Sequence, residues 1–218
     1  MKRYETPYIQ SPHTNACALA SFTMVAKTFF PHTTLDDIKR ITRWHDGKVV
    51  WAPPFHLWMV ENGVRIVAFD AVRYDIWREK GFDAMAEVLD PETFAFYKRN
   101  TFEPDVYRED IQKLAAKSGY TYHLQQPLPA DLKKALADGA VCEALVDSCA
   151  LNGKDGFSLH RIVVLSLDEE SITLHDPVNP GEAPRAAYKI PLQRFLKAWP
   201  SERGGPDSCE LCCYYPEG

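Results

Sequence analysis

Residues 14–30 read TNACALASFTMVAKTFF, and this stretch predicts an amphipathic helix near the beginning of the chain. Leu19, Phe22 and Phe29 recur at the spacing of one helix face. Pro31 cannot continue the helix, because its ring occupies the position of a backbone N–H donor. We therefore expect this helix to end at Pro31 and to pack its apolar face on the rest of the fold.

The beginning of the helix is marked by Thr14 or Asn15, either of which is a favourable N-cap residue. Cys17 then lies in the first turn, where backbone N–H groups lack helical partners and the helix dipole is positive. Both features stabilise a thiolate and lower a thiol pKa that starts near ~8.5. Cys17 is therefore a candidate nucleophile, and the alternative is a small buried apolar residue.

The pattern changes character further along the chain. Short helices are predicted at 34–44, 53–62, 130–137 and 191–199, and residues 71–117 are mostly helical. Strands are predicted at 64–68, 120–124, 141–146, 158–167, 171–176 and 209–215. Helices first and strands later indicate an α+β fold with an antiparallel sheet. We interpret 1–218 as a single domain with a nucleophile-helix region (1–44), a mostly helical insertion (45–109) and a sheet region (110–218).

Composition limits the classes of partner. The chain has 218 residues, of which 45% are hydrophobic and 25% charged, a balance typical of a globular protein with a real core. Its 25 Lys and Arg against 30 Asp and Glu give a formal charge of −5, so neither nucleic acid nor an anionic membrane is an expected partner. No apolar stretch approaches the ~20 residues that span a bilayer. Polar residues, such as Glu5 and Gln10, lie in the segment that would be apolar in a secretory signal peptide. We therefore expect a cytoplasmic protein with reduced thiols.

A nucleophilic cysteine needs a base, and His160 is the best candidate among the 7 histidines. It begins the most apolar predicted strand, on the same face as Ile162. Asp176 ends the next strand, from which a carboxylate can accept the imidazole N–H and orient the ring. His175 is the competing base, but as the neighbour of Asp176 in a strand it points to the opposite face. Alternatively, His160 is a core histidine and Asp176 a turn residue before a proline.

The remaining histidines lie in predicted loops or at element ends without a carboxylate placed by the pattern, and we interpret them as surface or satisfied core residues: His13, His32, His45, His56 and His123. An acyl transfer also needs donors for an oxyanion, and the backbone N–H of Cys17 is one. Gln10 lies seven residues before Cys17 in an extended segment, so its amide is a second candidate; the alternative is a surface glutamine.

Four stretches resemble the bacteriocin-processing, double-glycine-type peptidases of the papain-like clan: YIQSPHTNACALASFTMVAKTFF, LPADLKKALADGAVCEALVD, HRIVVLSLDEESITLHDP and YKIPLQRFLKAW. The resemblance covers about residues 4–44 and 110–200. It implies a papain-like fold in which Cys17 is the nucleophile, His160 the base, Asp176 the orienting carboxylate and Gln10 the oxyanion donor. The chain departs from the family at Ala18, where glycine is common, and at Arg161, where an aromatic or small residue is usual.

The predicted reaction is attack of the Cys17 thiolate on a peptide or amide carbonyl, with a thioester intermediate and no cofactor. The expected partner is a peptide or protein substrate. An acyltransferase, transpeptidase or deamidase would need the same residues, and a non-catalytic peptide-binding protein of the same fold is a further alternative. Cys209, Cys212 and Cys213 form a CxxC that can hold half a zinc site, but no second ligand pair accompanies it, so we predict buried thiols on a strand and no bound metal.

Overall fold

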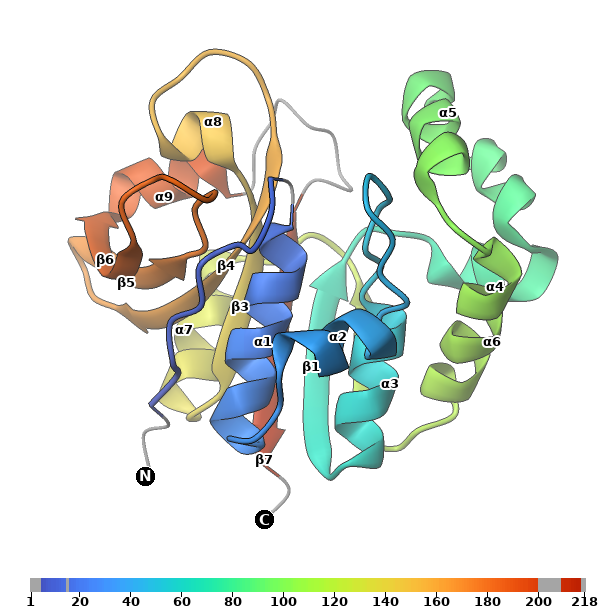
Figure 1. Cartoon of the computed structure of the whole chain (residues 1–218), viewed down its shortest axis with the longest axis horizontal. Helices are drawn as coiled ribbons and strands as arrows, with labels where there is room; N and C mark the ends of the chain where they lie inside the picture. The colour runs from blue at the N-terminus through green and yellow to red at the C-terminus, as the bar shows by residue number, and fades with distance from the viewer. Residues whose placement is uncertain (1–4, 15, 200–208, 217–218) are drawn as a thin grey trace.

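Seven strands form one sheet in the order β2-β1-β7-β3-β4-β5-β6 (Figure 1). The computed structural model describes residues 5–14, 16–199 and 209–216. The strands are β1 (Val64–Asp70), β2 (Tyr120–Leu124), β3 (Val141–Asp147), β4 (Leu159–Leu167), β5 (Ser171–Asp176), β6 (Arg185–Pro191) and β7 (Glu210–Pro216). Neighbouring strands are antiparallel except for β1 and β2, which run parallel. The predicted α+β class is confirmed, and the sheet is mostly antiparallel.

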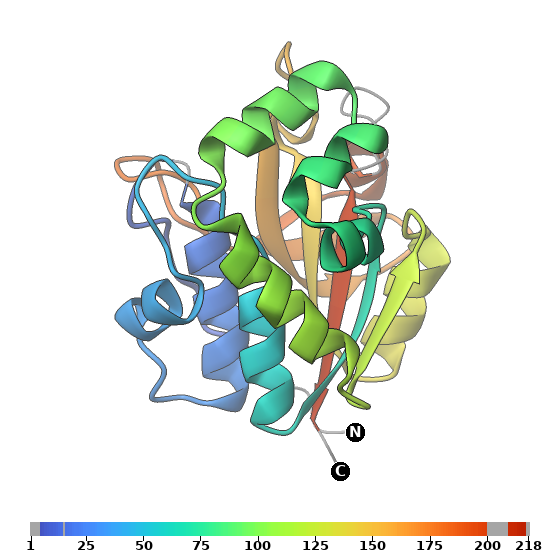
Figure 2. The same cartoon turned by 90° about the vertical axis from the view of Figure 1, so that its right-hand side faces the viewer.

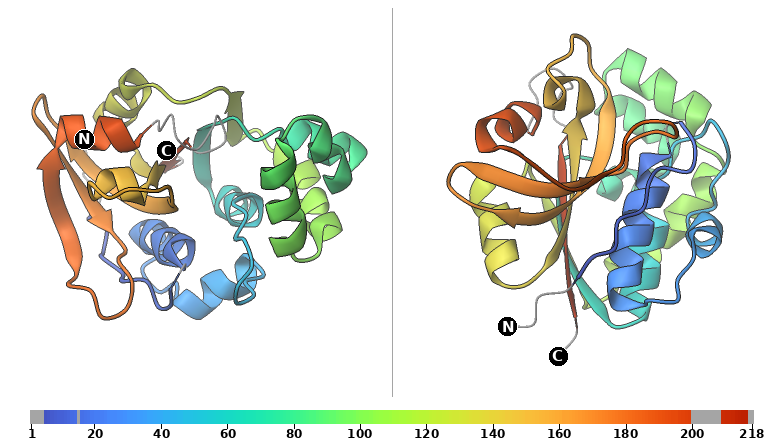
Figure 3. Two further views of the ribbon diagram at one scale, coloured as in Figure 1. Left: turned by 90° about the horizontal axis from the view of Figure 1, so that it is seen from above. Right: turned by 60° about the vertical axis from the view of Figure 1, so that its left-hand side comes forward.

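Helices cover both faces of the sheet (Figure 3). On one face, α1 (Cys17–Phe29) packs on β3 and β4, and α3 (Pro53–Glu61) packs on β1, with α2 (Leu35–Ile41) against them. On the other face lie α7 (Pro129–Ala137) and α9 (Leu192–Ala198), with the short α8 (Ser148–Leu151) beside α9. Each face has its own buried apolar cluster, so the sheet is covered on both sides.

The helical insertion is the connection that the parallel pair requires. Parallel neighbours need a crossover of a dozen or more residues, since a tight turn can join only antiparallel strands. Residues 71–119 make this crossover with α4 (Tyr74–Lys80), η1 (Phe82–Glu87), α5 (Pro91–Asn100) and α6 (Pro104–Ala115). These helices, brought to the front in Figure 2, have a separate core around the buried Trp77. The predicted sheet was antiparallel throughout, and this edge is the exception.

Local signals account for several boundaries. Thr34 caps α2 through a capping box with Asp37, as its position three residues upstream predicts. Gly63, at φ 79°, follows α3 where the sequence predicts its end. The N-cap of α1 is Ala16, not Thr14, and it makes no side-chain capping hydrogen bond. The other predicted cap, Asn15, lies outside the described residues. Among the described residues, no helix combines the length and apolarity that crossing a bilayer demands.

Candidate active site

Three of the four predicted catalytic residues, Cys17, His160 and Asp176, come from separate elements. Cys17 is the first residue of α1, His160 the second residue of β4 and Asp176 the last residue of β5. Val163 pairs with His175 across β4 and β5, so His160 and Asp176, which lie an odd number of residues from this pair, share the opposite face. Packing of α1 on β4 brings the helix N-terminus to the same end of the sheet, where Cys17 and His160 line one cleft.

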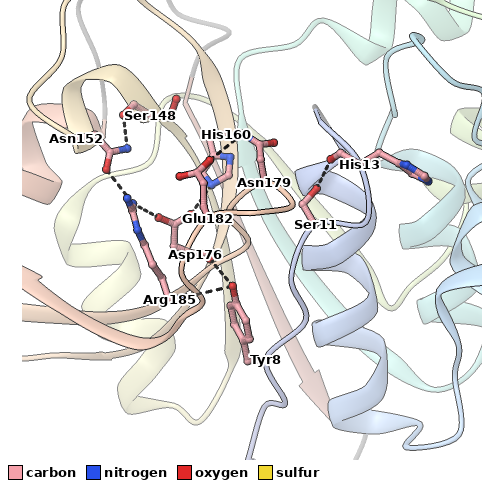
Figure 4. A network of polar contacts seen from close by, with 10 residues as sticks. All are labelled: Tyr8, Ser11, His13, Ser148, Asn152, His160, Asp176, Asn179, Glu182 and Arg185. Atoms are coloured by element: carbon pink, nitrogen blue, oxygen red, sulfur yellow. Dashed lines mark hydrogen bonds and ion pairs between the residues drawn. The ribbon is translucent and has the colours of Figure 1, made fainter.

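The imidazole of His160 is oriented by the carboxylate of Asp176. Its Nε2 lies 2.7 Å from Oδ1 of Asp176 (Figure 4). A carboxylate only accepts hydrogen bonds, so Nε2–H is the donor, and Nδ1 is left for the contact with Cys17. Asp176 is 2% exposed, whereas the His160 side chain is 16% exposed. The base is therefore oriented by a buried anion and remains accessible at the nucleophile.

The electrostatics of this pair favour a thiolate and an imidazolium. Burial raises the pKa of Cys17, but the hydrogen bond and charge of His160, with the backbone N–H and charge of Arg161, lower it to about 7. Burial lowers the pKa of His160, but hydrogen bonds to Asp176 and Cys17 and their charges raise it to about 10. Between these two pKa values the thiolate and the imidazolium coexist, which is the charge state a cysteine nucleophile needs.

Asp176 is itself held by contacts on its other side. Arg185 donates from Nη1 to Oδ2 of Asp176 at 2.7 Å and to Oδ1 of Asn152 at 2.8 Å. The hydroxyl of Tyr8 donates to the backbone oxygen of Asp176 at 3.2 Å and accepts the backbone N–H of Arg185 at 3.3 Å. Burial opposes ionisation of Asp176, but His160 and Arg185 hold its pKa below the usual value. Arg185, at the start of β6, was not predicted from the sequence.

The side chain of Gln10 contacts the loop between β5 and β6. Its Nε2 donates to the backbone oxygen of Asn179 at 3.0 Å and to that of Glu182 at 3.1 Å. The backbone N–H of Ser11 donates to Val178 at 3.2 Å, so this part of the N-terminal segment is tied to the loop between β5 and β6. In this arrangement Gln10 anchors the loop, and its role as an oxyanion donor stays a prediction.

His175 lies on the opposite face of β5 from Asp176, as its position next to Asp176 in the strand predicts. Its Nε2 lies 2.9 Å from the backbone oxygen of Thr6, and its Nδ1 accepts the backbone N–H of Ala187 at 3.0 Å. Because Nδ1 accepts, the proton is on Nε2 and the ring is neutral. Burial lowers the pKa of His175, in agreement with this assignment. His175 is a buried histidine held by the backbone.

Sequence reasoning missed a buried ionic cluster beside the nucleophile. Arg161, only 8% exposed, donates from Nη2 to Oε2 of Glu210, and its Nη1 lies 3.4 Å from Oε2 of Glu143. The hydroxyl of Tyr214 donates to the same Oε2 of Glu143 at 3.1 Å. Burial raises the pKa of Glu143 to about 8, whereas Arg161 holds the pKa of Glu210 below its usual value despite burial. Arg161 and Glu210 therefore form the charged pair.

The C-terminal cysteines lie on the predicted strand and are buried. Cys209 packs in the apolar cluster under α7 and α9, and Cys212 in the cluster under α1, so the two thiols of the CxxC lie on opposite faces of the sheet. They cannot share a metal ion in this arrangement.

A different trio could supply metal ligands. The ligand atoms of the buried side chains His56, Glu210 and Cys212 lie within 4.8 Å of one another. The thiol of Cys212 donates to Oε1 of Glu210 at 3.0 Å, and the other carboxylate oxygen binds Arg161. The hydroxyl of Tyr214 lies 3.1 Å from Nε2 of His56. These side chains satisfy one another through hydrogen bonds and an ion pair, so we assign them to the ionic cluster.

A cleft of about 860 Å³ opens at Cys17 and His160. One wall is the hairpin around residues 145–161, and the other is formed by residues 44–52 and α5 of the insertion. Three exposed apolar side chains line it, Phe157 and Leu159 on the first wall and Phe96 on the second. The insertion thus contributes part of the lining of this cleft.

Comparison with known proteins adds no relationship: no family model and no curated protein matches this chain.

Proposed function

We propose that this chain is a cysteine-dependent hydrolase of peptide or amide bonds with a papain-like arrangement of catalytic residues. The observation that carries the proposal is the hydrogen bond between His160 and Asp176 beside a cleft that Cys17 and His160 line together, with His160 lowering the pKa of the Cys17 thiol. The cleft is large enough for an extended peptide. The resemblance of the same residues to the bacteriocin-processing peptidases supports it independently of the geometry.

In the proposed mechanism the Cys17 thiolate attacks the carbonyl carbon, and the carbonyl oxygen becomes an oxyanion beside the N-terminus of α1. The imidazolium of His160 gives its proton to the leaving nitrogen as the C–N bond breaks, which leaves a thioester on Cys17. His160, now neutral, takes a proton from water as the water attacks the thioester. Breakage of the C–S bond releases the acid and restores the thiolate and the imidazolium.

A thiol-reactive peptide vinyl sulfone tests this proposal, because it modifies a cysteine only when the thiolate and an acid for the developing carbanion are in place. We expect one adduct per chain near neutral pH, located at Cys17 by peptide mass spectrometry, and a strong loss of labelling in His160→Ala. Equal labelling of both proteins would refute catalysis and favour a peptide-binding module. Mass spectrometry of the products formed from a peptide library then distinguishes hydrolysis, in which water accepts the acyl group, from transfer to an amine.

A further inference from the structure

The cleft contains a second polar position that the proposed chemistry does not use. Asp70 is the last residue of β1, it lines the same cleft as Cys17, and it is 3% exposed. Its Oδ1 accepts the backbone N–H of Val72 at 3.1 Å, and within the described part of the chain it forms no salt bridge. The nearby Arg161 is already paired with Glu210. Asp70 is thus a buried carboxyl group that faces the cleft without a cation of its own.

Burial without a cationic partner is costly for a carboxylate. Burial and the charge of Glu210 both raise the pKa of Asp70, and the hydrogen bond from Val72 and the charge of Arg161 offset this only in part. A positive group that enters the cleft would supply the missing charge. Ionisation of the Asp70 carboxyl group would therefore be more favourable in the complex than in its absence.

The side chains around this position suit the stem of a long cationic residue. Trp51 and Tyr74 both line the cleft, with ring centroids 6.4 Å apart and planes nearly perpendicular. Aromatic faces attract ammonium and guanidinium groups and also pack against methylene chains. At the rim, Asp46 and Glu92 add negative charge, whereas the one lysine among the lining residues, Lys48, donates to a backbone oxygen of the insertion.

The strand that ends at Asp70 lies close enough to the strand of His160 for one bound peptide to reach both. Leu145 of β3 pairs with Glu210 of β7 and with Arg161 of β4, and Asp70 ends the strand on the far side of β7. Three strand steps of about 4.8 Å separate β1 from β4, or ~14 Å in total. An extended peptide advances ~3.3 Å per residue, so a residue two or three positions from the scissile bond, with a long side chain, reaches Asp70.

We propose that this cleft binds a lysine or arginine side chain of a peptide substrate, and that Asp70 is the specificity-determining residue. The inference rests on the proposed function for its substrate class, because it takes the occupant of the cleft to be a peptide. Trp51 and Tyr74 contact the apolar stem, and the carboxylate of Asp70 binds the charged end.

The test compares peptides that carry one lysine, moved through the positions around the scissile bond, with peptides that carry norleucine at the same place. Norleucine keeps the apolar stem and lacks the charge. At one position the wild-type protein should prefer lysine by about 10- to 100-fold in kcat/KM, the effect of one hydrogen-bonded charge. Asp70→Asn keeps an oxygen for the N–H of Val72 and should reduce the preference to about 2-fold or less. Glu169→Gln, an exposed carboxylate in the turn between β4 and β5 and outside the cleft, is the matched control and should retain it.

Binding of the same peptides to Cys17→Ser, measured by calorimetry, separates specificity from catalysis. The lysine peptide should bind more tightly than the norleucine peptide, and Cys17→Ser/Asp70→Asn should remove the difference. Equal kcat/KM or equal binding at every position would overturn the inference while leaving the proposed hydrolysis intact. Lysine-selective binding without turnover by the wild-type protein would instead refute the hydrolase and support this subsite.

Discussion

Replacement of His160 by alanine is the sharpest test of how Cys17 is activated. In the native site, His160 is the main group that lowers the pKa of the thiol to about 7 from an ordinary value of 9.0, against the opposing effect of burial. Without the imidazole, the pKa of Cys17 should return to about 9 or above. This change of at least about two units corresponds to ~2.7 kcal/mol of lost stabilisation of the thiolate.

The effect on reactivity follows from the two pKa values. At pH 7 about half of the native Cys17 is thiolate, whereas a thiol of pKa 9 is only ~1% ionised, a ~50-fold difference. A more basic thiolate is intrinsically more nucleophilic, by about 10-fold over two units, so the alkylation rate at pH 7 should fall by only ~5-fold. The informative quantity is therefore the midpoint of the pH–rate profile, which should move upward by about two units.

The assay is alkylation by iodoacetamide from about pH 5 to pH 10, followed by mass spectrometry of the Cys17 peptide. Cys149 is the other cysteine that is not fully buried, so Cys149→Ser is the background for both proteins. Cys17→Ser in the same background measures alkylation at the remaining thiols. An unchanged midpoint in His160→Ala would refute the reasoning, because the low pKa of Cys17 would then arise from Arg161 and the helix N-terminus alone.

Three further substitutions test other contacts. Asp176→Asn removes the charge that raises the pKa of His160. Turnover should therefore fall by about 10²-fold or more, and the alkaline limb of the pH–rate profile should move to lower pH. An alkaline limb that does not move would argue against the orienting role of Asp176. Arg161→Met leaves Glu210 buried without its cation and should lower the free energy of unfolding, measured by urea titration, by about 3–5 kcal/mol. The double variant Arg161→Met/Glu210→Gln should recover part of this loss. If Arg161→Met alone is as stable as the native protein, the buried ion pair is contradicted. Gln10→Ala should leave alkylation of the nucleophile unchanged and reduce amide turnover by about 10²- to 10³-fold, and a change below about 3-fold would assign Gln10 to anchoring alone.

The candidate catalytic residues were accessible to sequence reasoning because their positions depend on periodicity. Cys17 follows from a helix that begins where the apolar repeat begins. His160 and Asp176 follow from the alternation of two neighbouring strands, since the same alternation that buries Ile162 places His160 on its face and His175 on the other. Such arguments need only the right strand assignment, and β4 and β5 have it.

The contacts around the candidate catalytic residues could not be predicted from periodicity in the same way. β6 is an edge strand whose side chains are mostly exposed, so its sequence lacks the apolar alternation that reveals a strand. The role of Arg185 therefore had no local signal. The ionic cluster did leave one, since Glu143, Arg161 and Glu210 each interrupt an apolar strand. Charges in such strands are almost never buried without partners, and this rule would have grouped the three.

The position of the insertion depends on the topology of the sheet, which the local sequence pattern does not specify. Its helices were expected from the turn residues and the apolar spacing, but their place in the molecule depends on the pairing of β1 with β2. Nothing in a single strand specifies whether its neighbour is parallel, and only the long connection indicates it. This crossover carries α5, which lines the cleft, so its contribution to the cleft could not be derived from the residues of α5 alone.

The beginning of α1 shows a conflict between helix stability and the proposed chemistry. A serine, threonine, asparagine or aspartate at the N-cap would satisfy a backbone N–H and stabilise the helix by about 1 kcal/mol. The chain has Ala16 there, with no side-chain capping bond. An acceptor at this position would compete for the same N–H groups that favour the thiolate of Cys17 and an oxyanion formed beside it. The missing capping bond makes the helix less stable but keeps its first N–H groups available to an anion. The capping preferences on which the prediction of Thr14 or Asn15 was based do not apply to such a helix end.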